Sequence, residues 1–303
     1  MVSALDVIED RAYYSDRVDW LQIRAGVDRA AATGLAYSYL DQVLADLGDA
    51  HSSLLRPYQA AGVFGPQNSP LDESEIPEVE RISSGIGYLR IPGVSAGVIR
   101  SGDALEFALT DAAEQYINSV RELILSNTDV CGWIVDLRDN GGGNALLMLA
   151  ALQPLLGVGV VTRFSGRDGT VSGISVDADG VPSGVDNLTR EWSEPFPSAA
   201  TDSSVAVLIN SSTASAAEAV VIAFSGRADT RSFGTATRGL PTANDVIPLA
   251  DGSVLLLTVS VGLDRAGNLY EGPIEPDVVV PGDLAAPRRT TEPQPQARHG
   301  LKR

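Results

Sequence analysis

Two short apolar runs in this sequence each lead, after a turn of small and polar residues, directly into an apolar segment long enough for a helix. The first is VCGWIVDL over 130–137, followed by RDNGGGN and ALLMLAALQPLL. The second is VAVLIN over 205–210, followed by SSTASAAEAVVIAFSG. Such runs are typical of strands buried on both faces, and strands that alternate with helices favour a parallel sheet. The sequence therefore predicts an α/β fold with a substantial parallel component.

Changes in composition divide the chain into four parts. Apolar residues at three- and four-residue spacing predict helices near the N-terminus, so residues 1–63 are expected to form a small helical cap that carries His51. Residues 64–82 are rich in proline and acids and are interpreted as a linker. Residues 83–282 form the expected core, and the polar, proline-rich residues 283–303 are expected to be a disordered tail.

The composition excludes several classes of partner and structure. The formal charge of −17 argues against nucleic acid or an anionic membrane surface, and makes a basic partner or cationic peptide plausible. A single cysteine excludes an intrachain disulfide, and no apolar stretch approaches the roughly 18–20 residues that span a bilayer. The start of the chain lacks the features of a signal peptide. We therefore expect a cytoplasmic protein as the sequence stands, or an extracellular or cell-surface one if a leader was removed.

Histidine and lysine are scarce in this sequence, and this limits the chemistry. The two histidines are His51 and His299, and the one lysine is Lys302, so all but His51 lie in the tail. A Schiff-base lysine, a phosphate-loop lysine and a serine–lysine dyad are therefore rejected. With no CxxC or HExxH motif, no metal and no cofactor is expected. Hydroxyl groups, carboxylates and a single imidazole remain for catalysis.

The segment Asn210-Ser-Ser-Thr-Ala-Ser-Ala-Ala-Glu218 is a candidate nucleophile turn. A turn between a strand and a helix would place Ser215 at a helix N-terminus, where free N–H groups and the helix dipole stabilise developing negative charge. The alternative is structural, because Ser215 and Glu218 also fit a capping box. The two interpretations are compatible, since a nucleophile can occupy the N-cap position.

Three glycines follow the first buried strand in the segment Asp136-Leu-Arg-Asp-Asn-Gly-Gly-Gly-Asn144. Glycine frees the backbone to turn N–H groups into a cavity. The N–H of Gly142 or Gly143, together with that of Ala216, would then form a two-donor oxyanion hole. The alternative is a flexible turn that caps the next helix. A nucleotide-binding loop is not indicated, since no Gly-Lys-Ser/Thr motif is present.

His51 lies in the segment GDAHSS and is the one imidazole outside the tail. A lone histidine is more often structural than catalytic. Here, however, any serine that is activated by a histidine must use this one. An unperturbed pKa near 6.5 suits the imidazole to accept and return a proton at neutral pH.

Together these segments resemble the C-terminal-processing and tricorn-type serine peptidases, over nearly the whole chain. VDLRDNGGG is similar to the family's D-L-R-x-N-x-G-G turn, and NSSTASAAE to its nucleophile turn T-A-S-A-x-E. The segment from GTATRGL to IEPDVVV is similar to the family's closing segment. The resemblance implies a crotonase- or Clp-protease-like spiral core of ββα units.

Two departures from the family pattern point to its histidine-using branch. The processing proteases carry a lysine where this chain has Leu240, and the roughly 30 residues between His51 and Gly85 leave no room for an inserted PDZ domain. DRVDWLQIR and LGDAHSSLL are similar to the nisin-resistance-like members, which have a helical N-terminal cap and a serine–histidine pair.

The resemblance implies a serine peptidase in which His51 activates Ser215, with Gly142 or Gly143 and Ala216 as the oxyanion hole. Because tricorn-like members support the histidine with a further hydroxyl and a glutamate, the candidate supporting residues are Ser52, Glu218 and Glu271. Closure of the cap is expected to assemble the site.

The expected substrate of this peptidase is a peptide or protein, and the acidic charge of the chain would favour a cationic one. Two other functions remain open at this point. One is hydrolysis or acyl transfer on a non-peptide ester or amide in a biosynthetic pathway, and the other is ligand binding without catalysis.

Overall fold

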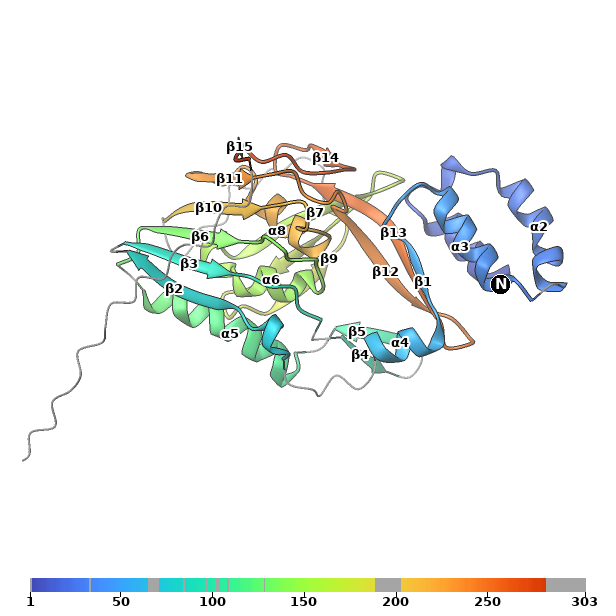
Figure 1. Ribbon diagram of the computed structural model, residues 1–303, viewed down its shortest axis with the longest axis horizontal. Helices are drawn as coiled ribbons and strands as arrows, with labels where there is room; N and C mark the ends of the chain where they lie inside the picture. The colour runs from blue at the N-terminus through green and yellow to red at the C-terminus, as the bar shows by residue number, and fades with distance from the viewer. Residues whose placement is uncertain are drawn as a thin grey trace, which may run out of the picture.

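The computed structural model describes the chain in nine stretches, namely residues 2–32, 34–64, 71–83, 85–95, 98–101, 104–107, 109–127, 129–188 and 203–281. Two large β-sheets form its framework (Figure 1). The predicted mixture of helices and strands is confirmed. The predicted tail, 283–303, lies outside the described residues, and the spiral arrangement of ββα units stays a prediction.

The first sheet has six strands in the order β15-β11-β10-β6-β3-β2. All neighbours in it are parallel except β2 and β3. In that order the strands are Val278–Val279, Thr230–Gly234, Ser204–Ile209, Gly132–Asp136, Ile86–Arg90 and Glu78–Ser83. The two apolar runs of the sequence are β6 and β10 at its centre, so the predicted parallel component is this sheet. Strand β2 lies, except for Ser83, inside the range 64–82 that is expected to be a linker. Its pairing with β3 makes it part of the core instead.

The second sheet has seven strands, and every pair in it is antiparallel. The strands are β1 (Ser53–Leu55), β7 (Gly159–Gly166), β8 (Val171–Val176), β9 (Pro182–Val185), β12 (Thr242–Pro248), β13 (Val254–Leu263) and β14 (Leu269–Tyr270). The long strand β13 is its centre, since it pairs with β1, β7, β12 and β14. The sequence pattern did not predict this antiparallel sheet. A separate two-stranded hairpin joins β4 (Val98–Ser101) to β5 (Ala104–Phe107).

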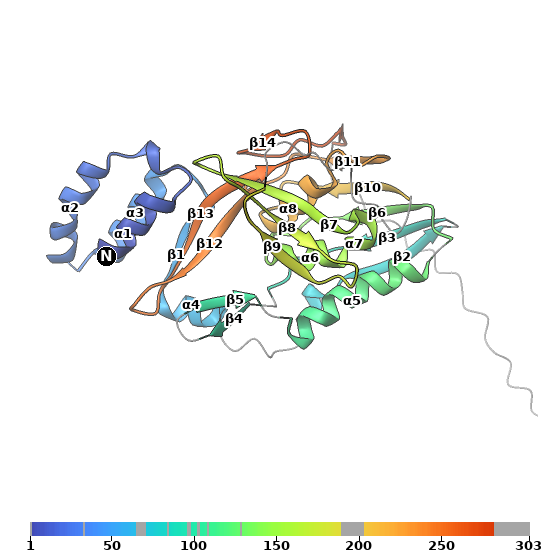
Figure 2. The ribbon, with the colours of Figure 1, turned by 180° about the vertical axis from the view of Figure 1, so that it is seen from behind.

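Helices fill the space between the two sheets, as the view from behind shows (Figure 2). These helices are α5 (Asp111–Ser126), α6 (Ala145–Ala151), α7 (Gln153–Leu156) and α8 (Ala216–Phe224). One hydrophobic core joins their buried side chains to those of β6, β10, β7 and β8. Every residue of α8 is buried, in keeping with a sequence that is apolar at every position except Glu218. Helix α8 is therefore enclosed in the core, whereas the turn before it reaches the surface at Ser211 and Ser212.

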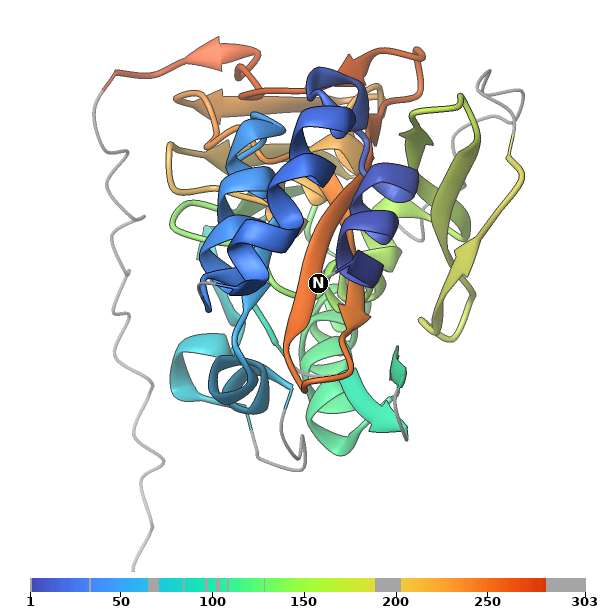
Figure 3. The ribbon, with the colours of Figure 1, turned by 90° about the vertical axis from the view of Figure 1, so that its right-hand side faces the viewer.

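The N-terminal helices form a second, smaller core against β13 (Figure 3). They are α1 (Val2–Arg11), α2 (Trp20–Ala32) and α3 (Ala36–Asp46), and a 3-10 turn at Ser15–Arg17 lies between α1 and α2. Helix α4 (Pro57–Val63) and a second 3-10 turn (Glu73–Glu75) follow later in the chain. The predicted N-terminal helices are confirmed. No helix in the described part of the chain is long and apolar enough to cross a membrane.

His51 stands at the start of a strand of the large antiparallel sheet. Strand β1 begins two residues later and pairs with β13, with Ser53 opposite Leu256. The His51 carbonyl also accepts a hydrogen bond from the Asn244 side chain, 3.2 Å away, on β12. The histidine is thus fixed to the second sheet and not carried on a separate helical cap.

Candidate active site

Three turns meet at the carboxyl ends of neighbouring parallel strands. Residues 137–144 follow β6, residues 210–215 follow β10, and residues 235–241 follow β11. In open α/β sheets, ligands bind outside the carboxyl ends of the strands. The candidate nucleophile turn and the candidate glycine turn are therefore at the edge of the sheet where a site is expected.

Ser215 adopts an unusual backbone conformation between β10 and α8. Its φ is +55° and its ψ is −119°, whereas an N-cap residue ordinarily has β-region dihedrals. A non-glycine residue with positive φ is uncommon and strained. Such a conformation persists only where the surrounding structure enforces it, and it is found most often at functional sites. Ser215 itself is half-buried. The turn thus displays this serine at the start of a buried helix.

Glu218 enforces that conformation from the first turn of α8. Its carboxylate is completely buried and accepts four hydrogen bonds. Oε2 accepts the N–H groups of Ser215 and Leu240, both at 2.8 Å, and Oε1 accepts the Thr237 hydroxyl at 2.5 Å and the Gly239 N–H at 2.9 Å. The capping-box pairing predicted between Ser215 and Glu218 is present, and the same carboxylate also binds the turn after β11.

Asn140 connects the glycine turn to the nucleophile turn. Its side-chain NH₂ donates to the Ile91 carbonyl at 2.8 Å, and its backbone carbonyl accepts the Ala214 N–H at 3.0 Å. Its Oδ1 accepts the Gly142 N–H at 2.9 Å. Of the two glycines considered for an oxyanion hole, Gly142 therefore already has an acceptor for its N–H group.

The glycines allow two close backbone approaches. A Cβ added to Gly142, which has φ +106°, would lie 2.8 Å from Ser215 Cβ and 3.3 Å from the Ala216 nitrogen. A Cβ added to Gly143, which has φ +120°, would lie 2.2 Å from the Val94 carbonyl oxygen. Within the described residues the Gly143 N–H has no acceptor, and Ala216 provides the first N–H of α8. The glycine turn thus lies against Ser215 with no side chain between them.

The imidazole of His51 contacts Thr242, the first residue of β12. Nδ1 lies 2.6 Å from the Thr242 hydroxyl oxygen. Burial lowers the pKa of His51 below its usual value, and the charge of the nearby Asp49 opposes this only in part. The imidazole is therefore neutral at neutral pH, the state that a general base requires.

Asp49 organises the loop that holds His51. Its carboxylate accepts the N–H groups of His51 at 2.9 Å and Ser52 at 2.6 Å, the Ser52 hydroxyl at 2.9 Å and the Thr258 hydroxyl at 3.1 Å. The Ser52 hydroxyl in turn accepts the Thr258 N–H at 3.0 Å. Ser52 therefore ties the loop to β13, and it is Thr242 whose hydroxyl contacts the imidazole.

One short segment, residues 240–242, connects the surroundings of Ser215 to His51. Leu240 is bound to Glu218 beside Ser215, and Thr242, two residues later, is bound to His51. In the described residues no direct hydrogen bond joins the Ser215 hydroxyl to the imidazole. Glu271, the third predicted supporting residue, is exposed. Burial is the main cause that raises the pKa of the Tyr14 phenol, and the negative charge of Glu271 is the second. Glu271 therefore lies towards the N-terminal helices.

Sequence reasoning missed three residues that shape this site, namely Asp49, Asn140 and Thr242. Asp49 and Asn140 lie inside segments that the sequence singled out, but they were not assigned a role. Nothing in the sequence around Thr242 marks it, because its contact with His51 spans 191 positions of the chain.

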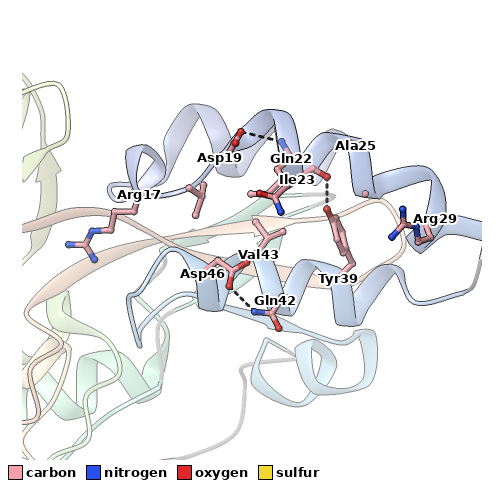
Figure 4. A pocket seen from close by; sticks show the side chains of 12 residues that line it. Arg17, Asp19, Gln22, Ile23, Ala25, Arg29, Tyr39, Gln42, Val43 and Asp46 are labelled. Carbon is pink, nitrogen blue, oxygen red and sulfur yellow. Dashed lines mark hydrogen bonds between the residues drawn. The ribbon is translucent and has the colours of Figure 1, made fainter.

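A recess of about 610 Å³ lies elsewhere, between α2 and α3 (Figure 4). Its polar lining includes Arg17, Asp19, Gln22, Tyr39 and Asp46, and none of the candidate site residues contributes to it. Across the described residues no group of three or more His, Cys, Asp or Glu side chains could hold a metal ion. The candidate site at the strand ends is therefore separate from this recess.

The model of the peptidase family S41 matches residues 85–280, which span both turns and every strand of the six-stranded sheet except β2. The chain belongs to peptidase family S41. The expected enzyme class, a serine-type peptidase, is thereby confirmed at the level of the family.

Individual relatives agree with this assignment. The nisin-resistance protein of Lactococcus lactis subsp. lactis is 30% identical over 175 residues, which cover 57% of this chain and 54% of that protein. The matched region thus spans about half the length of that relative. A lipoprotein from Streptococcus agalactiae has a similar structure, with a TM-score of 0.73 and 24% identity over 92% of this chain and 90% of that one. A photosystem II D1 C-terminal processing protease shares the fold, with a TM-score of 0.56 and 15% identity over 92% of both chains.

We expect Glu218→Gln to destabilise the fold by about 2–4 kcal/mol, because the amide NH₂ would face backbone donors that the carboxylate now satisfies. Urea unfolding measures the change. Glu122→Gln is the matched control, since Glu122 is an exposed residue of α5, and it should stay within about 0.5 kcal/mol of the wild type. Equal stabilities of the two variants would contradict the role given to Glu218.

Proposed function

We propose that this chain hydrolyses peptide bonds with Ser215 as nucleophile and His51 as general base. The observation that carries the proposal is the strained backbone of Ser215, displayed at the start of α8 against the glycine turn. A serine held in this way on a strand-to-helix turn is the arrangement that nucleophile elbows use. Membership of family S41 supports the same assignment.

The contact between His51 and Thr242 supports the choice of base. With Nδ1–H donated to the Thr242 oxygen, the lone pair of the imidazole is on Nε2. Nε2 would accept the Ser215 proton as the hydroxyl attacks the scissile carbonyl, and would return that proton to the leaving amine. Water would then hydrolyse the acyl-enzyme by the same steps. Asp49 and Ser52 are positioning residues in this scheme, since they hold the loop and not the imidazole ring.

The oxyanion would be bound by the N–H groups of Gly143 and Ala216. Gly143 is preferred to Gly142 because the Gly142 N–H already donates to Asn140. Gly142 contributes by having no side chain, so that the turn can approach Ser215 Cβ. Each such donor is typically worth about 2.7–4 kcal/mol of the barrier. Glu218 positions Ser215, and Glu271 has no step in the mechanism.

Peptides are the favoured substrates because the chain belongs to a peptidase family. The name of one relative refers to resistance to nisin. The net charge of −17 would attract cationic peptides over long distances. Hydrolysis of a non-peptide ester or amide would use the same residues, and a pure ligand-binding protein would not need a reactive serine. One experiment separates these three functions.

A fluorophosphonate probe should label the wild type at Ser215, and a diverse peptide library analysed by mass spectrometry should show cleaved products. Ser215→Ala should abolish both results. Ser212→Ala is the matched control, because Ser212 is an exposed serine of the same turn, and it should retain both. Labelling without peptide cleavage would favour an ester or amide substrate, and the absence of labelling would favour ligand binding.

The rate of labelling should depend on pH through His51. Because burial lowers the pKa of the imidazole, the rate should fall only below about pH 6.5, where the base becomes protonated. Thr242→Val should slow labelling about tenfold at pH 7.5, which is the worth of one hydrogen bond to the imidazole. Thr170→Val, which removes a hydroxyl that donates to Asp168 in the turn between β7 and β8, should not. A profile with no acid limb, or an unaltered rate in Thr242→Val, would exclude His51 as the base.

A further inference from the structure

Most of the arginine side chains that the structure describes in this acidic protein have a partner. Six of them form ion pairs with carboxylates, and others bind carbonyls, side chains or aromatic rings. Among the arginine side chains that the structure describes, Arg231 and Arg238 are the two for which no ion pair, hydrogen bond or ring contact is found. Both are exposed. Only Arg238 lies at the candidate active site.

Arg238 has a fixed position beside the nucleophile turn. Its N–H donates to the Thr213 carbonyl at 2.9 Å, and Thr213 precedes Ser215 by two residues. Two residues of chain span at most about 7 Å, so the Arg238 nitrogen lies within about 10 Å of the Ser215 backbone. That distance is within the reach of a long arginine side chain and one or two substrate residues.

The residues on both sides of Arg238 are also held in place by hydrogen bonds. Thr237 and Gly239 each donate to Glu218 Oε1. Gly239 has φ +93°, and a Cβ on it would lie 2.8 Å from Pro273 Cδ. The backbone that carries the guanidinium is therefore pre-organised, which reduces the entropy lost when a ligand binds.

Three of the carboxylates around this turn are already engaged. Asp136 pairs with Arg138, Asp139 accepts the Asn210 side-chain NH₂ at 2.9 Å, and Glu218 is saturated by its four donors. The guanidinium of Arg238 thus has no carboxylate partner within the described part of the protein. An anionic group on a bound molecule would meet a guanidinium that forms no ion pair within the described residues.

We propose that Arg238 binds a carboxylate of the peptide substrate close to the scissile bond and so determines specificity. A guanidinium presents a planar fork of donors that matches a carboxylate. The carboxylate comes either from the C-terminus of the peptide or from an Asp or Glu side chain. This selection is compatible with a cationic substrate, because the net charge acts at long range while Arg238 acts on one group at contact distance. The inference rests on the proposed peptidase function.

The test compares matched versions of one peptide that the wild type cleaves. The versions are the free acid, the C-terminal amide, and peptides with Glu or Gln at each position next to the cleaved bond. We expect the wild type to cleave one carboxylate version with a kcat/KM about fivefold to tenfold above its neutral counterpart. Arg238→Gln should lose that preference. Arg231→Gln, the matched control at the opposite end of β11, should keep it.

The outcomes separate this inference from the function on which it rests. A free acid preferred to the amide identifies the C-terminus as the source of the carboxylate, and Glu preferred to Gln identifies a side chain. A wild type with no preference, or a preference that persists in Arg238→Gln, overturns the inference. All variants should still react with the fluorophosphonate probe at Ser215. If the wild type is neither labelled nor active on any peptide, the proposed function fails and the inference fails with it.

Discussion

The buried carboxylate of Glu218 is the interaction on which the site depends. A carboxylate in a protein interior is destabilising unless hydrogen bonds satisfy it, and this one accepts four. The donors come from two separate segments, the start of α8 and the turn after β11. Because both segments bind the same two oxygen atoms, the strained serine and the turn that leads into β12 have a fixed relation to each other.

That relation extends from one sheet to the other. Ser215 follows a strand of the parallel sheet, whereas His51 precedes a strand of the antiparallel sheet. The residues from Leu240 to Thr242 join the two, since one end is bound to Glu218 and the other to the imidazole. The candidate site is thus built where the two sheets meet. Its geometry is set by the packing between them more than by the closure of a separate cap.

Local patterns in the sequence predicted one half of this arrangement well. The apolar strands β6 and β10, the glycine turn and the serine turn are each contained in a short stretch, so their spacing was sufficient to predict them. The second half depends on contacts between distant residues. The antiparallel sheet around β13 and the pairing of His51 with Thr242 join positions far apart in the chain, and no local periodicity reports such contacts.

Two expectations changed for a physical reason that the sequence did not contain. Gly142 was as good a candidate as Gly143 for an oxyanion donor until the Asn140 side chain was found to accept its N–H. Residues 64–82 are interpreted as linker because they are rich in proline and acids, yet residues from Glu78 onward pair with β3 as an edge strand. In both cases the local sequence fits either alternative, and a hydrogen bond or a strand pairing determines which one the structure adopts.

The central claim is that the imidazole of His51 and the hydroxyl of Ser215 meet during catalysis. A crystal structure of the protein after reaction of Ser215 with a phosphonate tests it most directly. The account predicts His51 Nε2 within about 2.6–3.2 Å of Ser215 Oγ or a phosphonyl oxygen, with Nδ1 still on Thr242. A second phosphonyl oxygen should contact the N–H groups of Gly143 and Ala216. An adduct in which the imidazole remains out of reach of the reacted serine would contradict the account.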